Sequence, residues 1–221
     1  MNDNDVLLLV PTQFEADRLT DSLQPWFRGR LEICGFGVIA AAARTALLLE
    51  QIRPRRVVLC GIAGAYDGGP EVGTAWRFRQ VGCDGIGVGS GNDFISAEQL
   101  GWLQWRGAGT ADSPAIGDTL SVEFACSDAA SLDAPGTLLT CCAASASLVD
   151  AAQKCQRHPD AVAEDMEGFA VAAACRLAGV PLDIVRGISN QAGNRDHSTW
   201  QVDTALQAAA NVVRQLLSTD R

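Results

Sequence analysis

One stretch of this chain, residues 161–196, limits the possible folds more than any other. A short apolar run leads into a segment with apolar residues on every face, which is typical of a helix packed between other elements. Gly179 and then Pro181 end that helix, and residues 182–188 have the length and the β-branched content of a strand. Strand, helix and strand in succession predict an α/β fold, in which ligands bind outside the carboxyl ends of the strands.

Three polar side chains directly follow predicted strands. Glu167 and Asn190 follow the two strands of this stretch, and Glu15 follows the first apolar run of the chain, residues 6–10. We therefore expect Glu167 and Asn190 to flank one crevice. Glu15 stands at the start of a predicted helix, where the helix dipole alone favours a carboxylate, so its position leaves a structural role equally open.

The charge balance argues against a nucleic-acid partner. The net charge is −9 and the pI about 4.6, whereas a nucleic-acid surface needs clustered Lys and Arg. With 48% apolar and 19% charged residues, the chain is expected to form a single domain over residues 1–221. The longest apolar runs fall short of the roughly 18 residues of a membrane span. The acidic first residues are unlike a signal peptide, which favours a cytoplasmic protein.

The eight cysteines are interpreted as reduced, mostly buried thiols. The chain has no Cys-x-x-Cys pair, only two histidines, and most of its cysteines lie inside apolar runs. We therefore expect a reducing compartment, no disulfide framework and no metal site.

The remaining elements follow from apolar runs and turn residues. A glycine-rich segment, residues 61–65, is expected to be a tight turn after a strand at 57–60, and it lacks the full pattern of a phosphate or dinucleotide loop. Residues 82–113 are predicted as a long excursion, with Trp102 and Trp105 on one face of a short helix. The other predicted elements are strands at 31–35, 74–81 and 136–140, and helices that end near 23 and 52, run from 147 to about 158, and run from about 198 to 216.

Glu15, Glu167 and Asn190 together meet the requirements for splitting an N-glycosidic bond. One carboxylate orients and deprotonates water, and a second grips ribose hydroxyls as the sugar approaches an oxocarbenium ion. A hydrogen-bond donor stabilises the negative charge that grows on the departing base. Asn190 suits this third task. Because its amide donates without giving up a proton, it favours a 6-oxo purine over adenine.

Three motifs resemble the nucleoside phosphorylase and nucleosidase superfamily, across nearly the whole chain. They are Gly61-Ile62-Ala63-Gly64, Asp165-Met166-Glu167-Gly168 and Val185-Arg186-Gly187-Ile188-Ser189-Asn190. The step from Glu167 to Asn190 is similar to that in methylthioadenosine/S-adenosylhomocysteine nucleosidases. The resemblance implies a three-layer α-β-α sandwich with a mixed central β-sheet.

The same resemblance implies roles for single residues. Glu15 matches a carboxylate that activates water, and Met166 with Glu167 matches a pair that holds the ribose. Asn190 stands where those nucleosidases have an Asp that handles adenine, so the departure fits a changed base. The chain also departs from them at Ile62, where a hydroxyl residue is common.

A further departure is at Ala144, where those nucleosidases place an aromatic residue against the purine. The residue that stacks on the base is therefore left open between Phe124 and Phe169.

A closer resemblance is to the futalosine hydrolase family, in residues 158–169 and 189–196 and at Trp200. It implies hydrolysis of futalosine to hypoxanthine and dehypoxanthinyl futalosine, a step of an alternative route to menaquinone. Water is then the nucleophile, the ligand is a small-molecule nucleoside, and no cofactor is implied. The predicted substrate-binding residues are Met166, Ala63, Gly64, Ser189 and Arg195.

Futalosine carries a benzoate, and a fork of N–H donors suits its carboxylate. Arg195 is the candidate, with the alternative that it pairs with Asp196 or Asp118 and holds its loop. Arg44 and Arg186 are further cationic options, although Arg186 lies inside a strand and is expected to brace one of the two glutamates.

Other functions stay open on sequence alone. A purine nucleoside phosphorylase would depend on phosphate, a methylthioadenosine/S-adenosylhomocysteine-type nucleosidase would prefer 6-amino purines, and a nucleoside-binding regulatory module would release no base. The presence of Glu15, Glu167 and Asn190 counts against the regulatory module. Because the superfamily usually forms dimers or larger assemblies, a homo-oligomer is expected.

Overall fold

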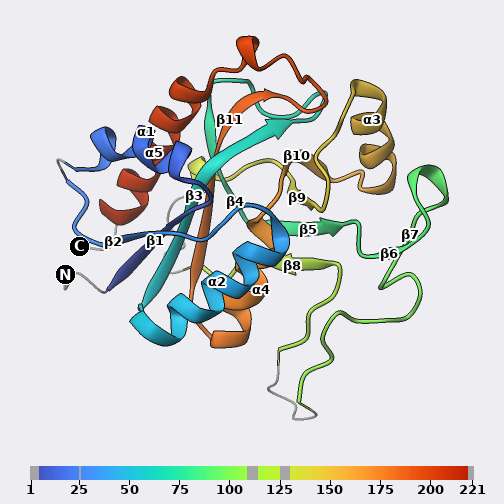
Figure 1. The fold of residues 1–221 in the computed structure, drawn as a ribbon, viewed down its shortest axis with the longest axis horizontal. Helices are drawn as coiled ribbons and strands as arrows, with labels where there is room; N and C mark the ends of the chain where they lie inside the picture. Colours follow the sequence, from blue (N-terminus) through green and yellow to red (C-terminus); the bar gives the residue numbers. More distant parts are fainter. Residues whose placement is uncertain (1–4, 25, 109–113, 125–129, 219–221) are drawn as a thin grey trace.

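The centre of the protein is a mixed β-sheet with helices on both faces (Figure 1). The computed structural model describes residues 5–24, 26–108, 114–124 and 130–218. Its strands are β1 (Val6–Val10), β2 (Arg30–Ile33), β3 (Arg56–Ala65), β4 (Ala75–Phe78), β5 (Gln80–Asp84), β8 (Thr119–Ser121), β9 (Thr137–Cys141), β10 (Ala161–Asp165) and β11 (Leu182–Gln191), with β6 (Gly87–Val88) and β7 (Ile95–Ser96) as a separate pair.

Strand β3 connects the two halves of the sheet. It pairs in parallel with β1 over its first residues and with β11 along its length, and its last residues pair antiparallel with β10. From β10 the sheet continues in parallel to β9 and β5. Strand β2 joins β1 in parallel, while β4 and β8 add antiparallel edges to β11 and β5. The predicted mixed sheet is therefore confirmed.

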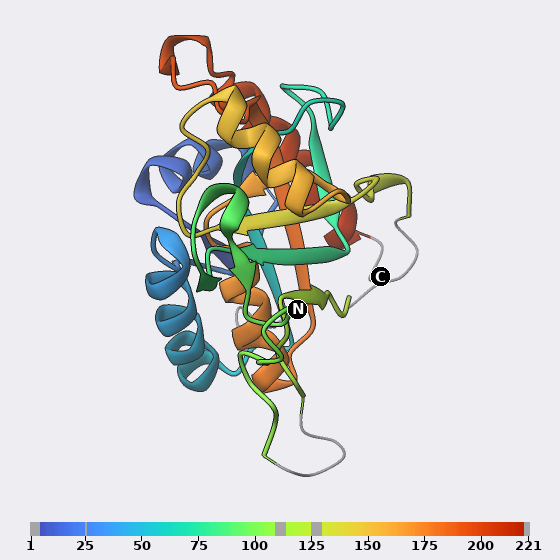
Figure 2. The same ribbon diagram turned by 90° about the vertical axis from the view of Figure 1, so that its right-hand side faces the viewer.

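Alternate residues of the strands face two different helical layers. Leu7 and Leu9 pack with α2 (Gly37–Ile52) and α4 (Gly168–Ala178), which lie side by side in Figure 2. Leu8 packs instead with α1 (Gln13–Leu23) and α5 (Val202–Ser218), which lie together on the other side of the sheet in Figure 1. Helix α3 (Leu148–Arg157) covers the part of the sheet that includes β9. The predicted three-layer α-β-α sandwich is confirmed.

Helix ends form where the local sequence predicts them. The side chain of Thr12 accepts a hydrogen bond from the Glu15 amide at the start of α1, and Ser147 accepts one from the Asp150 amide at the start of α3. Gly179 ends α4 with a left-handed φ of 66°. The helix start at Ser147 and the helix end at Gly179 agree with the sequence prediction, because both depend on residues close in sequence.

The glycine-rich segment at 61–65 is not the expected turn. Strand β3 runs through it to Ala65, because β11 on one side and β10 on the other supply hydrogen-bond partners for its backbone. Strand β11 likewise continues past Ile188 to Gln191. Both strands are longer than predicted, and their added residues include Ala63, Gly64 and Asn190 of the candidate site.

Two further expectations need correction. The strand predicted at 74–81 is two strands, β4 and β5, that join different parts of the sheet. Trp102 and Trp105 do not lie on a helix, and their side chains are 68% and 45% exposed. The last helix begins at Val202 rather than near 198, after a 3-10 turn at His197–Thr199.

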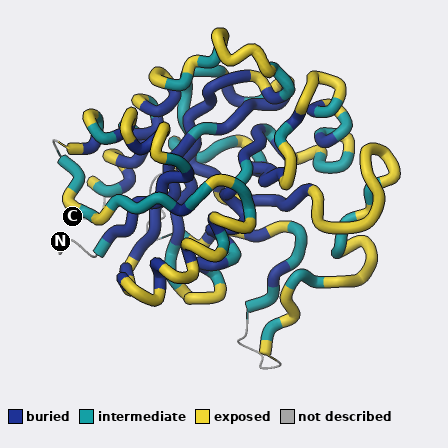
Figure 3. Tube along the Cα trace, in the orientation of Figure 1, coloured by how far each residue is buried: buried dark blue, intermediate teal, exposed yellow. Residues whose placement is uncertain are grey.

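The segment between β5 and β8 is the long excursion that the sequence predicts. In its described part, most residues are exposed, and Figure 3 shows them largely in yellow beyond the buried sheet. The seven cysteines in the described residues are unpaired, and five of them are buried, as expected; Cys126 lies outside those residues. In the same residues, no helix is long and apolar enough to span a bilayer.

Candidate active site

Glu15 lies in the first turn of α1, just beyond the carboxyl end of β1. Its carboxylate is held from two sides: Oε1 accepts from the backbone N–H of Ile62 at 3.0 Å, and Oε2 accepts from the Thr12 hydroxyl at 2.5 Å. The side chain is 4% exposed. Because both oxygens retain lone pairs and the donors fix the group, Glu15 is oriented to accept a further proton or hydrogen bond.

Glu167 stands between β10 and α4 and is also 4% exposed. Its Oε1 accepts from the backbone N–H of Gly37, the first residue of α2, at 3.1 Å. Its Oε2 accepts from Arg186 Nη2 at 3.2 Å, which confirms that Arg186 braces one of the two glutamates. No local sequence pattern points to Gly37 as a partner of Glu167, because the two residues lie 130 positions apart in the chain.

Arg186 is fully buried and is anchored mainly by Asp165. Asp165 Oδ2 accepts from Arg186 Nε at 3.0 Å and from Nη2 at 2.6 Å, while its Oδ1 accepts from the Thr140 hydroxyl. Asp165 Oδ2 also accepts from the Gly168 amide at the start of α4. Asp165 therefore fixes both the arginine and the helix that follows Glu167.

Gly61 lets the side chains of Glu15 and Arg186 approach the β3 backbone closely. A side chain at this position would overlap with Arg186 Nη1, and its Cβ would stand 2.7 Å from Glu15 Oε1. Arg186 Nη1 is buried and has no hydrogen-bond partner among the residues that the structure describes. Both side chains therefore lie tightly against the β3 backbone, and glycine at position 61 leaves the room that they need.

Charge is unevenly balanced in this cluster, which we call the site-end cluster (Glu15, Asp165, Glu167 and Arg186). Burial raises the pKa of Glu167 to about 7, Asp165 and Glu15 add to the rise, and Arg186 opposes it. Burial works to lower the pKa of Arg186, but the three carboxylates outweigh burial and raise it. The arginine therefore stays charged, while Glu167 changes protonation near neutral pH.

Asn190 has an amide whose orientation is set by its neighbours. The Ser189 hydroxyl donates to Asn190 Oδ1 at 2.8 Å, and Asn190 Nδ2 donates to the Gln191 carbonyl at 2.8 Å. These contacts identify the oxygen as an acceptor that is already used and leave the second Nδ2 hydrogen for another partner. Ser189 itself is fully buried, and its hydroxyl also reaches the Ala63 carbonyl at 3.3 Å. Ser189 therefore orients Asn190, and its predicted contact with the substrate stays a prediction.

Ala63 and Gly64 connect the two parts of the site along β3. A Cβ at Gly64 would stand 3.4 Å from Asn190 Nδ2, as one at Gly61 would meet Glu15 and Arg186. Three residues of strand span about 10 Å, so Asn190 lies about that far along β3 from the site-end cluster. Met166 is half-buried between Asp165 and Glu167.

Arg195 lies apart from these residues, on the exposed turn after β11. Its guanidinium stands 5.4 Å from the centre of the Trp200 ring, and Trp200 Nε1 donates to the Asn194 carbonyl at 3.1 Å. Within the described residues, no ion pair joins Arg195 to Asp196 or Asp118, the alternative partners considered from the sequence.

The two candidates for stacking on a base are both engaged elsewhere. The Phe124 ring lies 4.0 Å from the guanidinium carbon of Arg77, near the amino end of β11. Phe169 is 4% exposed and belongs to the core between the sheet and α2 and α4. Beside the glutamates, however, Phe14 and Phe36 are 50% and 65% exposed. The sequence alone did not single out Phe14 and Phe36, because an aromatic residue beside a site and one in the core look the same in a single sequence.

The fold and these contacts define a class of protein: an α/β enzyme with paired carboxylates and an oriented amide at the carboxyl ends of its strands. The model of the family described as the phosphorylase superfamily matches residues 31–219. The chain therefore belongs to the phosphorylase superfamily.

Individual relatives narrow the comparison. The chain is 33% identical to a futalosine hydrolase of Streptomyces coelicolor, covering 82% of this chain and 75% of the relative. It is 31% identical to a futalosine hydrolase of Thermus thermophilus, covering 96% and 95%. A solved structure of a methylthioadenosine/S-adenosylhomocysteine nucleosidase from Colwellia psychrerythraea in complex with adenine is 20% identical, covers 96% of this chain and 94% of that chain, and has a TM-score of 0.72. The predicted superfamily, its likeness to futalosine hydrolase and the enzyme class, an N-glycosidase, are confirmed.

Proposed function

We propose that this enzyme hydrolyses the N-glycosidic bond of futalosine, releasing hypoxanthine and dehypoxanthinyl futalosine as a step toward menaquinone. The observation that carries the choice of base is the fixed amide of Asn190, whose Oδ1 is occupied by Ser189 and whose Nδ2 retains a hydrogen to donate. The futalosine hydrolases that match most of this chain support the choice of nucleoside.

In this proposal Glu15 is the general base. The Ile62 amide and the Thr12 hydroxyl hold its carboxylate, so little reorganisation is needed when it takes a proton from water. Arg186 is fully buried, and its positive charge offsets the neighbouring carboxylates of Glu15, Asp165 and Glu167. The water oxygen then bonds to the sugar carbon as the bond to the purine nitrogen breaks.

Glu167 grips the ribose hydroxyls. Its two oxygens are held by Gly37 and Arg186, and each has a remaining lone pair for a hydroxyl donor. Hydrogen bonds from the sugar shorten as the ring gains positive charge, so the contribution is larger in the transition state than in the bound substrate. Met166, half-buried beside Glu167, supplies an apolar contact to the sugar.

Asn190 stabilises the leaving group. The base departs with the bonding electron pair, and the free Nδ2 hydrogen donates to its ring nitrogen or to the 6-oxo oxygen. An amide cannot transfer a proton, so the base takes its proton from solvent after the bond has broken. Arg195 captures the benzoate of the substrate, since its side chain is exposed on the turn that follows Asn190.

The test is release of free hypoxanthine from futalosine in phosphate-free buffer, with inosine and methylthioadenosine as parallel substrates. Release from futalosine alone supports the proposal and shows that the benzoate portion is required. Release from methylthioadenosine instead favours the adenosine-type nucleosidase, the activity named for other relatives of this chain. Release only after phosphate is added would make the enzyme a phosphorylase.

A further inference from the structure

Another buried ion pair lies on the α3 side of the sheet, outside the site-end cluster. Glu164 of β10 is 6% exposed and Lys154 of α3 is 4% exposed, with 3.6 Å between Glu164 Oε2 and Lys154 Nζ. Glu164 also accepts from the Tyr66 hydroxyl at 2.9 Å. Replacing such a pair by apolar residues often costs no stability, so a buried pair of this kind calls for another explanation.

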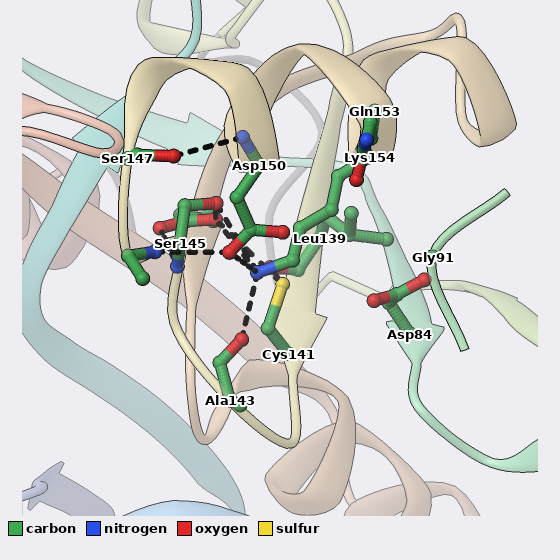
Figure 4. A network of polar contacts seen from close by, with 12 residues as sticks. Asp84, Gly91, Leu139, Cys141, Ala143, Ser145, Ser147, Asp150, Gln153 and Lys154 are labelled. Carbon is green, nitrogen blue, oxygen red and sulfur yellow. Dashed lines mark hydrogen bonds and ion pairs between the residues drawn. The ribbon is translucent and has the colours of Figure 1, made fainter.

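The pair holds the segment that joins β9 to α3, residues 142–147. Ser145 is fully buried and donates to Glu164 twice, from its amide at 2.8 Å and from its hydroxyl at 2.6 Å. Lys154 Nζ donates to the Ala143 carbonyl at 2.7 Å and to Ser145 Oγ at 3.1 Å, as Figure 4 shows. The segment is not part of a strand, and Glu164 and Lys154 satisfy the Ser145 amide and the Ala143 carbonyl within it.

The same segment abuts the turn that follows β11, the strand that carries Asn190. A Cβ at Gly193 would overlap with the Ser147 carbonyl oxygen, and Gly193 has a φ of 85° that suits glycine. The backbone of Glu164 also pairs with Gly64, the residue that lies against Asn190 Nδ2. The ion pair therefore reaches the Asn190 end of the site by two routes, one through residues 142–147 and one through β3.

We propose that Glu164, neutralised by Lys154, is a positioning residue that holds residues 142–147 as a wall beside Asn190 and thereby sets discrimination between purine bases. The inference rests on the proposed function, which assigns the base to Asn190. Glu164 touches neither the site-end cluster nor Asn190 through its side chain. It acts through Ser145, so its loss alters how the base is held while Glu15 and Arg186 stay in place.

The test compares three variants with the wild-type protein. Glu164→Gln leaves Lys154 without a buried counter-charge, whereas Glu164→Gln combined with Lys154→Met removes both charges. Ser145→Ala removes only the hydroxyl between them and keeps the ion pair, so it stays folded even where the other variants do not. Asp133→Asn, which disturbs ion pairs with Arg77 and Arg79, serves as a control for destabilisation alone.

The readout is the ratio of kcat/KM for futalosine to kcat/KM for its 6-amino counterpart with the same sugar and tail. We expect this ratio to fall about tenfold in the double variant and about threefold in Ser145→Ala, with KM raised more than kcat is lowered, and to stay unchanged in Asp133→Asn. A ratio that stays within twofold of wild type in the folded variants, with only the melting temperature lowered, would overturn the inference.

Calorimetry with free hypoxanthine and free adenine separates this inference from the proposed function. If the wild-type protein releases no base from any nucleoside, the proposed function fails, and the relative affinity for the two bases still decides the positioning role. Selective loss of hypoxanthine affinity in Ser145→Ala and in the double variant supports the role. Equal affinity in all variants, or no binding of hypoxanthine to the wild-type protein, overturns it.

Discussion

Strand β11 contributes to two buried ion clusters, through Asp183 near its amino end and through Arg186 near its middle, and the two clusters balance their charges differently. In the first cluster, Asp183 accepts a hydrogen bond from Arg56 at 2.9 Å and forms an ion pair with Arg77. Asp133 forms ion pairs with Arg77 and Arg79. There arginines outnumber carboxylates, and each oxygen of Asp183 and Asp133 has a guanidinium partner.

In the site-end cluster the balance is reversed. Arg186 alone faces Asp165, Glu167 and Glu15, and one of its buried nitrogens has no hydrogen-bond partner in the described part of the chain. Where every carboxylate oxygen has a guanidinium partner, the cluster stabilises the fold, whereas surplus carboxylates keep acceptor positions for a ligand. The comparison supports our proposal that the first cluster serves stability and the second serves chemistry.

The largest effect is expected from Glu15→Gln. The change keeps the contacts to Ile62 and Thr12 largely intact but removes the proton acceptor, so kcat should fall by about 10²–10⁴-fold with little change in the melting temperature. Steady-state kinetics and thermal unfolding check both parts. A near-normal rate would remove Glu15 from the base role.

Asp183→Asn should show the opposite pattern. It leaves Arg56 and Arg77 without the charge of a fully buried carboxylate, so the free energy of unfolding should drop by about 3–5 kcal/mol, while kcat/KM per folded molecule stays unchanged. The matched control is Asp203→Asn, which breaks an exposed pair with Arg18 and should cost less than about 1 kcal/mol. Denaturant titration measures the difference. Lost activity in folded Asp183→Asn would contradict the division between the clusters.

The raised pKa of Glu167 predicts a pH dependence of both stability and rate. Between the unfolded pKa of 4.5 and the folded pKa of about 7, the folded state holds a proton that the unfolded state has lost. The free energy of unfolding should therefore decline as pH rises through this window, by up to about 3 kcal/mol, and kcat/KM should rise as the carboxylate forms. Glu167→Gln should flatten both curves. Identical pH profiles for the variant and wild type would mean that another group titrates.

The smallest effect is expected from substitutions at and beside Asn190, which should change the preference for 6-oxo over 6-amino purines. Asn190→Asp supplies a group that can donate a proton, so the preference for 6-oxo over 6-amino purines should fall by about tenfold. Ser189→Ala, which frees the amide to rotate, should reduce the same preference by a few-fold. Competition between the two substrates measures it. Unchanged preference in both variants would undo the role given to Asn190.

The order of elements and many of their ends could be predicted from the sequence because they depend on neighbours in the chain. Thr12 and Ser147 cap helices through contacts three residues away, and Gly179 ends a helix by its own φ. The extension of β3 to Ala65 could not be predicted from the sequence. This glycine-rich segment becomes a strand only because β10 and β11 supply hydrogen-bond partners for its backbone.

The candidate site likewise contains residues that the sequence identified and contacts that it did not. Glu15, Glu167 and Asn190 were identified because each follows a strand, and their contacts fit that interpretation. The Gly37 amide that holds Glu167, and the placement of Phe124 beside Arg77 instead of a base, depend on contacts between distant segments that no local pattern encodes.

The most direct test of the account is to follow the oxygen of water into the sugar product. Futalosine is incubated with the wild-type enzyme in phosphate-free buffer made with ¹⁸O-labelled water, and the product is analysed by mass spectrometry immediately. The account predicts that dehypoxanthinyl futalosine gains one ¹⁸O from the first turnover and that Glu15→Gln slows its formation. A product that forms only with phosphate present, as a sugar phosphate without the label, would contradict water activation by Glu15 as the central step.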